Sequence, residues 1–265
     1  MTMIETPDVL TEAPSLLSAD HRAELMSDVL TQVRISGALF LKGQYTTPWA
    51  FDSPGSGDLI DLLAPRAERL IVFHRVVKGR AWVMANGHRV DLEMGDFAIL
   101  PASHQHLMGS PEAVEPVAMA SLLPPAPWSG IPRLQHGGGG VETEIVCGYF
   151  SCDELLFNSF LRSLPPVIKV RPEGAAATML EAALAYALED GELCGGVALV
   201  RHVPELLLVE ALRLYSEQAS PQTGWLAAAG DAIVSRALKL MHEAPARDWS
   251  VDDLARGAHT SRSVL

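Results

Sequence analysis

The pattern of apolar and polar positions changes twice along the 265-residue chain. Apolar residues recur at helical spacing over residues 19–34, which predicts a helix there. Over residues 35–152 the apolar positions fall in short alternating runs that are broken by turn residues, as is typical of β-strands. Helical periodicity then returns in three longer segments, at residues 174–190, 203–218 and 231–245. The chain is therefore predicted to have an α+β fold, with a β part before a helical part.

Turn chemistry divides the β part into many short strands. Asn86-Gly87 is a strong hairpin signal, because both residue types tolerate a positive φ. Residues 124–140 are rich in proline and glycine and are predicted to form a loop. The four glycines at 137–140 precede a strand rather than open a helix, so a flexible loop is favoured over a phosphate-binding loop. Such short strands with frequent turns predict a sandwich or small barrel. Strands are predicted at 69–79, 115–123 and 141–152. Residues 80–90 are predicted to form a strand, the Asn86-Gly87 turn and the start of a returning strand. Residues 91–101 are predicted to contain a second turn at Met94-Gly95-Asp96 and then a short strand.

One stretch, "GDFAILPASHQH", suggests which barrel this is. Gly95, Pro101 and His106 keep the spacing of the second sequence motif of cupin barrels, with Ser103 where that motif usually has glycine. The glycine makes a turn, the apolar run fills the barrel wall, and the loop after the proline directs a histidine into the barrel mouth. The first cupin motif is poorly kept, because Val72 stands where its glutamate would be. The usual metal-binding set of a cupin enzyme is therefore not present.

Nearly the whole chain resembles the AraC-type (AraC/XylS) transcription regulators that have a cupin-like N-terminal domain. The resemblance rests on phrases in the expected order: "MSDVLTQVRISGALF", "PWAFD", "FHRVVKGRAWV", "LEMGDFAILPASHQH", "GGGGVETEIVCGYF", "LLFNSFLRSLPPVIKV", "LLLVEALRLY" and "GWLAAAGDAIVSRALKLMHEAPARDWSVDDLARGAHTSRS". It implies a cupin-like barrel or jelly roll, a helical dimerisation segment and the beginning of a helix-turn-helix. The expected parts are a flexible N-terminus at 1–18, a sensor domain at 19–170, a helical linker at 171–230 and an incomplete DNA-binding region at 231–265.

The last segment, "WSVDDLARGAHTSRSVL", has the features of a supporting helix and a turn. Ser250 is a predicted N-cap, with Asp253 at the capping-box position. His259 stands where the family's turn usually carries glycine. The recognition helix has barely begun at the last residue, which indicates a truncated DNA-binding region and weak or absent DNA binding by this chain. The residues expected in that region are Ser250, Arg256, Thr260, Ser261 and Arg262.

Two kinds of site are predicted in the barrel. A small-molecule effector would contact aromatic and histidine side chains, since such pockets are mostly apolar with few polar groups. The expected residues are Trp49, Phe73, His74, Trp82 and His106. A metal such as zinc or nickel would be bound by His74, His106 and Cys147, with His104 and His136 as further candidates. The alternative is that the histidines are hydrogen-bonded wall residues and that Cys147 is a small buried apolar residue.

The helical segment is predicted to mediate a homodimer, which would match paired half-sites on DNA. The expected interface residues are Leu206, Val209, Leu212 and Leu214. This helix is apolar on more than one side. The alternative is therefore that it packs within its own chain.

Charge and composition limit which kinds of protein the chain can be, in particular a nucleic-acid-binding, membrane, secreted or enzymatic one. The net charge is −12, which argues against a whole surface that binds nucleic acid. Residues 231–265 contain five basic and five acidic residues, so the excess lies before them. The sequence shows no signal peptide and no membrane-spanning run, and its three cysteines fit no disulfide framework, so a cytoplasmic protein is expected. No catalytic nucleophile motif is present. A metal-dependent cupin enzyme, a dioxygenase or an isomerase, is the alternative to a regulator.

Overall fold

A computed structural model describes residues 35–63, 67, 70–124, 131–152, 161, 164–189, 207–215 and 230–265. The predicted helix at 19–34 lies outside these residues. The chain divides into two compact units, one of residues Val29–Ser220 and one of residues Met1–Asp28 with Pro221–Leu265. Each unit is described by itself.

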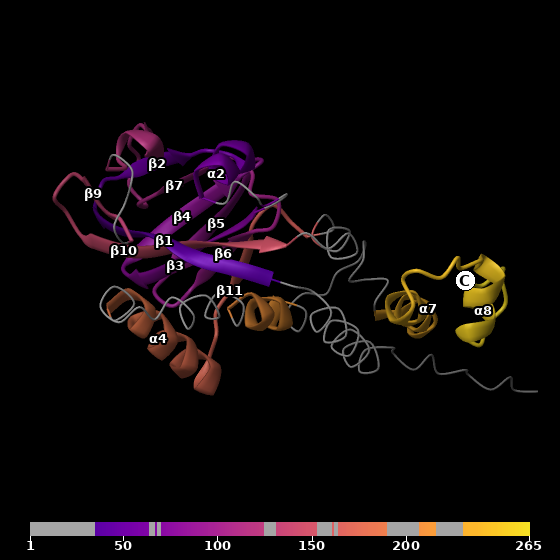
Figure 1. The fold of residues 1–265 in the computed structure, drawn as a ribbon. Coiled ribbons are helices and arrows are strands. Elements are labelled where there is room, and N and C mark those ends of the chain that lie inside the picture. The colour runs from indigo at the N-terminus through magenta and orange to yellow at the C-terminus, as the bar shows by residue number, and fades with distance from the viewer. Residues whose placement is uncertain are drawn as a thin grey trace, which may run out of the picture. The chain divides into compact units, whose positions relative to one another are not determined.

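The larger unit contains two β-sheets, as the α+β prediction required (Figure 1). The six-stranded sheet has the order β11 (Ile168–Val170), β6 (Phe97–Leu100), β3 (Leu70–Lys78), β10 (Glu142–Cys152), β1 (Ile35–Thr46) and β9 (Arg133–Gly137). The five-stranded sheet has the order β5 (His88–Glu93), β4 (Arg80–Ala85), β7 (His106–Gly109), β2 (Ala50–Ser53) and β8 (Val117–Ala118). Helix α2 (Ser56–Leu63) follows β2.

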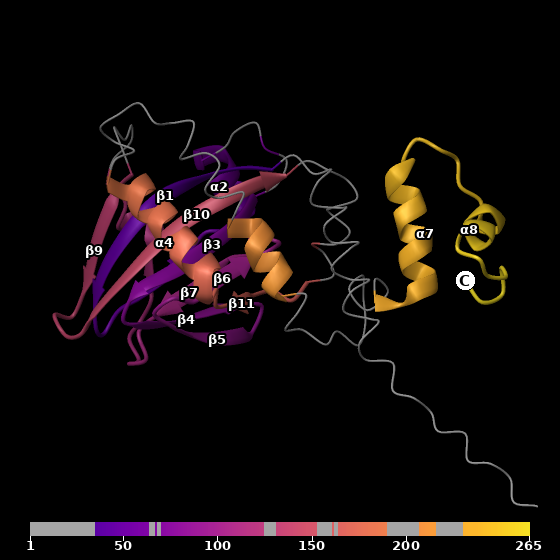
Figure 2. The same ribbon diagram turned by 90° about the horizontal axis from the view of Figure 1, so that it is seen from below.

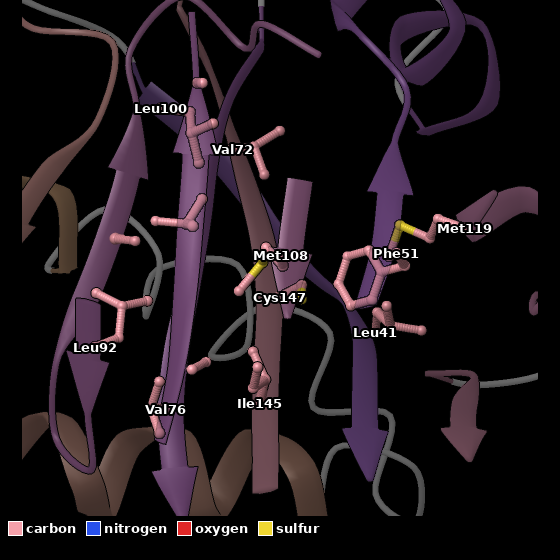
Figure 3. Close-up of a cluster of buried hydrophobic side chains, with 14 of the residues drawn as sticks. Leu41, Phe51, Val72, Val76, Leu92, Leu100, Met108, Met119, Ile145 and Cys147 are labelled. Atoms are coloured by element: carbon pink, nitrogen blue, oxygen red, sulfur yellow. The ribbon is translucent and has the colours of Figure 1, made fainter. Parts of the chain in front are cut away.

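The hydrophobic core lies between the two sheets. Side chains alternate between the two faces of a strand, so every second residue of each strand faces inward. On β1 the inward row includes Leu41 and Tyr45, and on β10 it includes Ile145 and Cys147. Figure 3 shows Leu41, Phe51, Met108 and Cys147 among the side chains between the strands. The sandwich is thus held together by one apolar interior to which both sheets contribute.

The predicted hairpin is confirmed, and two other predictions are corrected. Asn86 and Gly87 have φ values of 49° and 75°, and they connect the antiparallel strands β4 and β5. Residues 115–123 were expected to form one strand, but only Val117–Ala118 pair, and the 3-10 helix η1 (Met119–Ser121) follows. The predicted loop 124–140 contains β9, which pairs parallel to β1 through backbone hydrogen bonds that its composition concealed.

The four-glycine segment passes closely over the end of β1. The backbone N–H groups of Gly138 and Gly140 donate to the carbonyl oxygens of Thr46 and Thr47, at 2.9 Å each. A Cβ atom at Gly137 would lie 1.9 Å from the Thr46 carbonyl oxygen. The segment is thus a loop that precedes β10 and opens no helix, as predicted, and its glycines allow close backbone contact.

Helices lie against the outer face of the six-stranded sheet. Figure 2 shows α4 (Gly174–Glu189) and the helix at residues 207–215 on this face. Arg75 of β3 forms an ion pair with Glu181 of α4, with 3.0 Å between nitrogen and oxygen. The predicted helices at 174–190 and 203–218 are thus present in their described parts.

A buried carboxylate connects β11 to the turn before β6. Asp96 is fully buried and accepts hydrogen bonds from Arg171 Nε at 2.5 Å and from the Glu93 backbone N–H at 2.8 Å. Lys169 Nζ lies 3.1 Å from Asp96 Oδ2, the oxygen that also accepts from the Glu93 N–H. Burial alone raises the pKa of Asp96, but these hydrogen bonds and cations bring the pKa below its ordinary value.

The smaller unit contains α7 (Ala232–Glu243) and α8 (Val251–Gly257). Asp231 caps α7 by accepting hydrogen bonds from the backbone N–H groups of residues 233 and 234. The two helices approach closely, since a Cβ atom at Gly257 would lie 2.4 Å from a methyl group of Leu240. Within the described part of the chain, no helix is long and apolar enough to cross a membrane.

Candidate functional site

The predicted cupin histidine is held in place by the loop that precedes it. Ser103 stands at the motif's usual glycine position and has a φ of 44°, in the left-handed region that favours glycine. Its hydroxyl donates to the Leu70 carbonyl oxygen at 2.5 Å and accepts from the Val72 backbone N–H at 3.1 Å. These bonds fasten the loop to β3 and place His106 opposite His74.

His74, His106 and Cys147 form a buried chain of hydrogen bonds. His74 Nδ1 lies 2.9 Å from Cys147 Sγ, and His74 Nε2 lies 2.8 Å from His106 Nε2. His106 Nδ1 lies 3.0 Å from the carbonyl oxygen of His104. All three side chains are almost completely inaccessible to solvent. We call the three side chains the relay.

The last acceptor of the relay determines where its protons lie. A carbonyl oxygen can only accept, so His106 Nδ1–H donates to His104 and His106 Nε2 is left as an acceptor. His74 Nε2–H therefore donates to His106, and His74 Nδ1 accepts the proton of the Cys147 thiol. In this order both histidines and the thiol are neutral, and every polar hydrogen of the relay has a partner.

The pKa shifts favour the same neutral state. Burial lowers the pKa of His74 well below its ordinary value, and the nearby His106 lowers it further. Burial lowers the pKa of His106 to about 4, against smaller raising effects of the His104 carbonyl and of Asp52. Burial raises the pKa of the Cys147 thiol. Each shift disfavours the charged form, as expected in an apolar interior.

The predicted metal ligands come together only in part. His74, His106 and Cys147 are neighbours, but His74 lies between the other two and uses both ring nitrogens, so the donors do not surround a common point. His104 lines a surface cleft of about 540 Å³, and His136 lines another of about 410 Å³, three strands away from β3. In the residues that the structure describes, no group of three or more metal-binding side chains is arranged to hold an ion. The relay as it stands does not fit a single metal ion.

The three aromatic residues predicted to contact an effector do not all face the core: one lies between the sheets and two lie on outer faces. Trp49 is fully buried in the core between the sheets, together with His74 and His106. The side chain of Phe73 lies on the opposite side of β3 and stacks on Phe150, with ring centroids 4.8 Å apart. Trp82 is half-buried on the outer side of β4 and donates to the Ser110 carbonyl oxygen at 2.6 Å. Phe73 and Trp82 therefore do not face the interior that contains the relay.

Two residues of the site were not predicted. Tyr45 is buried beside Trp49, with ring centroids 4.4 Å apart, and its pKa is raised by burial and by Cys147. The alternation of Leu41, Gly43 and Tyr45 along β1 could have indicated it. Ser103 was noticed only as a departure from the cupin motif, and its two hydrogen bonds carried no sequence signal.

The predicted dimerisation residues differ in exposure. Leu206 lies outside the described residues. Leu212 is 1% exposed and packs within its own chain, Leu214 is half-buried, and Val209 is 37% exposed. The helix at 207–215 therefore has an inner face that is already buried and an outer face that includes Val209.

The residues expected to approach DNA lie at the start of α8, at its end and after it. Ser250 and Asp253 form the predicted capping box, with the Asp253 N–H donating to Ser250 Oγ at 3.1 Å. His259 has a φ of 57°, so a histidine occupies a left-handed turn position. Arg256 forms an ion pair with Asp253 at 2.5 Å. Arg262 Nη1 lies 3.5 Å from Asp252 Oδ2. Thr260 and Ser261 lie in the turn segment that follows α8.

A family model described as "Cupin" matches residues 24–217, so the chain belongs to the cupin family. Two relatives from Streptomyces are described as putative AraC-like transcription regulators. The one from Streptomyces lividans is 29% identical over 251 residues, covering 91% of this chain and 75% of its own length. The one from Streptomyces antibioticus is 28% identical over 253 residues, covering 91% and 76%. Over most of its length the chain is thus a cupin-family protein that is similar to AraC-like transcription regulators.

Among solved structures, the chain matches unsaturated fatty acid bound ToxT from Vibrio cholerae, with 10% identity and a TM-score of 0.34. That match covers 88% of this chain and 71% of ToxT. The similarity is too low to transfer any property of ToxT. The two Streptomyces relatives are described as transcription regulators, which agrees with the expectation of a regulator rather than an enzyme.

Proposed function

We propose that the barrel senses a small effector, that the helices after it mediate a homodimer, and that residues 231–265 belong to the DNA-binding part of the regulator. The observation that carries the proposal is the polar content of the barrel interior. Several side chains with hydrogen-bonding groups lie between the sheets, where apolar residues would suffice for packing. They include Tyr45, Trp49, His74, His106 and Cys147. An interior with few, well-placed polar groups is typical of small-molecule sites.

Dimerisation is proposed through the outer face of α4 and of the helix at 207–215. Met179 of α4 is 46% exposed, and Val209 is the exposed apolar residue of the second helix. Leu212 is excluded from this interface, because it already packs inside its own chain. A two-fold dimer uses the same patch on both subunits, so Met179 and Val209 would be buried on each of them.

The mass in solution tests the dimer. The expected value is about twice the chain mass of 28.5 kDa, measured by light scattering. Replacing both Met179 and Val209 by glutamate should weaken the dimer by at least about tenfold, because it places four charges in an apolar contact. Val141→Glu is the matched control, since Val141 is exposed on the loop that follows the glycines. A wild-type chain that stays monomeric at high concentration would refute dimerisation.

DNA binding by this chain is expected to be weak or absent. Affinity for DNA depends on cations that are free to contact phosphates. Arg256 and Arg262 are instead paired with Asp253 and Asp252, and residues 231–265 carry as many acidic as basic residues. A titration against a random duplex library at low salt tests this expectation. Nanomolar, sequence-specific binding would overturn it and would assign a complete DNA-reading surface to the chain.

A further inference from the structure

Among the described residues, two buried hydrogen-bond donors in the barrel interior have no partner. Tyr45 is 1% exposed and Trp49 is 0% exposed, yet neither the Tyr45 hydroxyl nor Trp49 Nε1 makes a hydrogen bond within the described residues. An unpaired buried donor is unfavourable, because it has lost its bonds to water. Phenylalanine at position 45 would keep the buried ring and avoid this cost, and an apolar side chain at position 49 would also avoid it. The two donors are thus unnecessary for packing alone.

The two donors belong to one aromatic cluster. The Tyr45 and Trp49 rings are stacked, and Phe51 lies with its centroid 5.5 Å from Tyr45 and 5.7 Å from Trp49. Met108 and Met119 belong to the same core, and Figure 3 shows Met119 beside Phe51. Methionine side chains are flexible and adapt their packing to a new neighbour. The surroundings of the two donors can therefore repack around an apolar molecule.

The same interior contains no compensating charge. Among the described residues, the charged side chains that are buried are Arg75 and Asp96. Arg75 pairs with Glu181 of α4 on the outer side of β3, and Asp96 pairs with Lys169 and Arg171, so neither offers a charge to the core around Tyr45 and Trp49. The relay is neutral, and each of its polar hydrogens already has a partner. An anion placed here would lose its hydration without gaining a cation, at a high free-energy cost. An uncharged acceptor oxygen avoids this cost.

We infer that Tyr45 and Trp49 form the polar end of a binding site in the barrel for an uncharged, largely apolar molecule that carries an acceptor oxygen, such as an ester, lactone or ketone. This inference rests on the proposed effector-sensing function and specifies its ligand chemistry. The hydroxyl of Tyr45 and the indole N–H of Trp49 donate to the oxygen, while Phe51 and the methionines contact the apolar body. The relay remains intact beside the site.

Three probes with the same ring system test this ligand chemistry. Methyl 2-naphthoate carries a neutral acceptor, 2-naphthoate carries a charge, and naphthalene carries neither. Equilibrium dialysis measures the affinity of each for the wild-type chain and for Tyr45→Phe and Trp49→Phe. The matched control is Trp82→Phe, because Trp82 lies on the outer face and donates to Ser110 instead.

The ester is expected to bind the wild-type chain at least tenfold more tightly than the carboxylate. Each of Tyr45→Phe and Trp49→Phe should weaken ester binding by about fivefold, which corresponds to the loss of one hydrogen bond. Naphthalene binding should stay within about twofold in both variants, and Trp82→Phe should behave as the wild type. Without a probe, Tyr45→Phe should unfold at the same or a higher urea concentration, because it has lost an unpaired donor. Trp49→Phe also loses buried ring volume and should unfold at a lower urea concentration.

Three results would overturn the inference: tighter binding of the carboxylate than of the ester, unchanged ester binding in both variants, or binding of none of the probes. The first two leave an effector site in the barrel and refute only its chemistry. The regulator function is judged separately, by the mass in solution and the DNA titration, which use no ligand.

Discussion

The neutral relay predicts a specific loss of stability in mild acid. The perturbation is a change of pH from 7.5 to 4.5, with His106→Gln as the comparison chain. The pKa of His106 is about 4 in the folded protein and 6.5 ordinarily. The unfolded chain therefore binds a proton at a pH where the folded chain does not. The contribution of His106 to stability is fully present above pH 6.5 and is lost as the pH falls from 6.5 to about 4.

The magnitude follows from the separation of the two pKa values. At about 1.4 kcal/mol for each pH unit, the wild-type chain should lose about 3 kcal/mol more than His106→Gln across this range. His74 is coupled to His106 through a hydrogen bond, and its pKa is lowered in the same direction, so the loss belongs to the pair. Carboxylates that titrate in the same range contribute equally to both chains and cancel in the comparison.

Urea unfolding, followed by tryptophan fluorescence at several pH values, measures the effect. His88→Gln is the control, because His88 is exposed on β5 and should keep the wild-type pH dependence. If the wild-type chain and His106→Gln lose the same free energy between pH 7.5 and 4.5, the neutral, buried relay is refuted. A parallel loss in all three chains would point to the carboxylates alone.

Three further predictions concern stability. Asp96→Asn should lower the unfolding free energy by about 2–3 kcal/mol in urea, because a buried carboxylate loses charged hydrogen bonds, whereas Glu93→Gln on the exposed rim should change it by less than about 0.5 kcal/mol. Gly137→Ala should destabilise by about 2–3 kcal/mol through the clash with the chain beneath it, while Gly57→Ala, with open space around it, should be neutral in thermal unfolding. Ser250→Ala should cost about 1 kcal/mol in hydrogen-exchange protection of α8, and unchanged protection would refute the capping box.

Part of this structure could be predicted from the sequence because local rules govern it. The Asn86-Gly87 turn, the helix periods and the Ser250 cap depend on neighbouring residues alone, and the structure contains each of them. The cupin motif predicted that its histidine would enter the barrel, and His106 lies buried there, 2.8 Å from His74 Nε2.

Other features depend on which strands become neighbours. β9 pairs with β1 across about ninety residues, and nothing in its composition indicates that partner. Phe73 and His74 are consecutive on one strand, so both could not face the same interior, and strict use of the strand period would have excluded one of them. The unpaired state of Tyr45 and Trp49 is a property of the packed core and has no counterpart in a local pattern.

The glycine segment at 137–140 fixes the position of β1 along its own axis, because its backbone is bonded to Thr46 and Thr47. β9 and β10 flank β1 on either side, and the connection between them has to cross its end. The crossing leaves no room for a Cβ atom at Gly137, Gly138 or Gly140, so a shift of β1 by one residue in either direction would cause a collision. A slip of one residue would turn Leu41 and Tyr45 outward and exchange the inner and outer rows of the strand. The glycine segment at 137–140 thereby determines which side chains of β1 face the barrel interior and can contact a ligand.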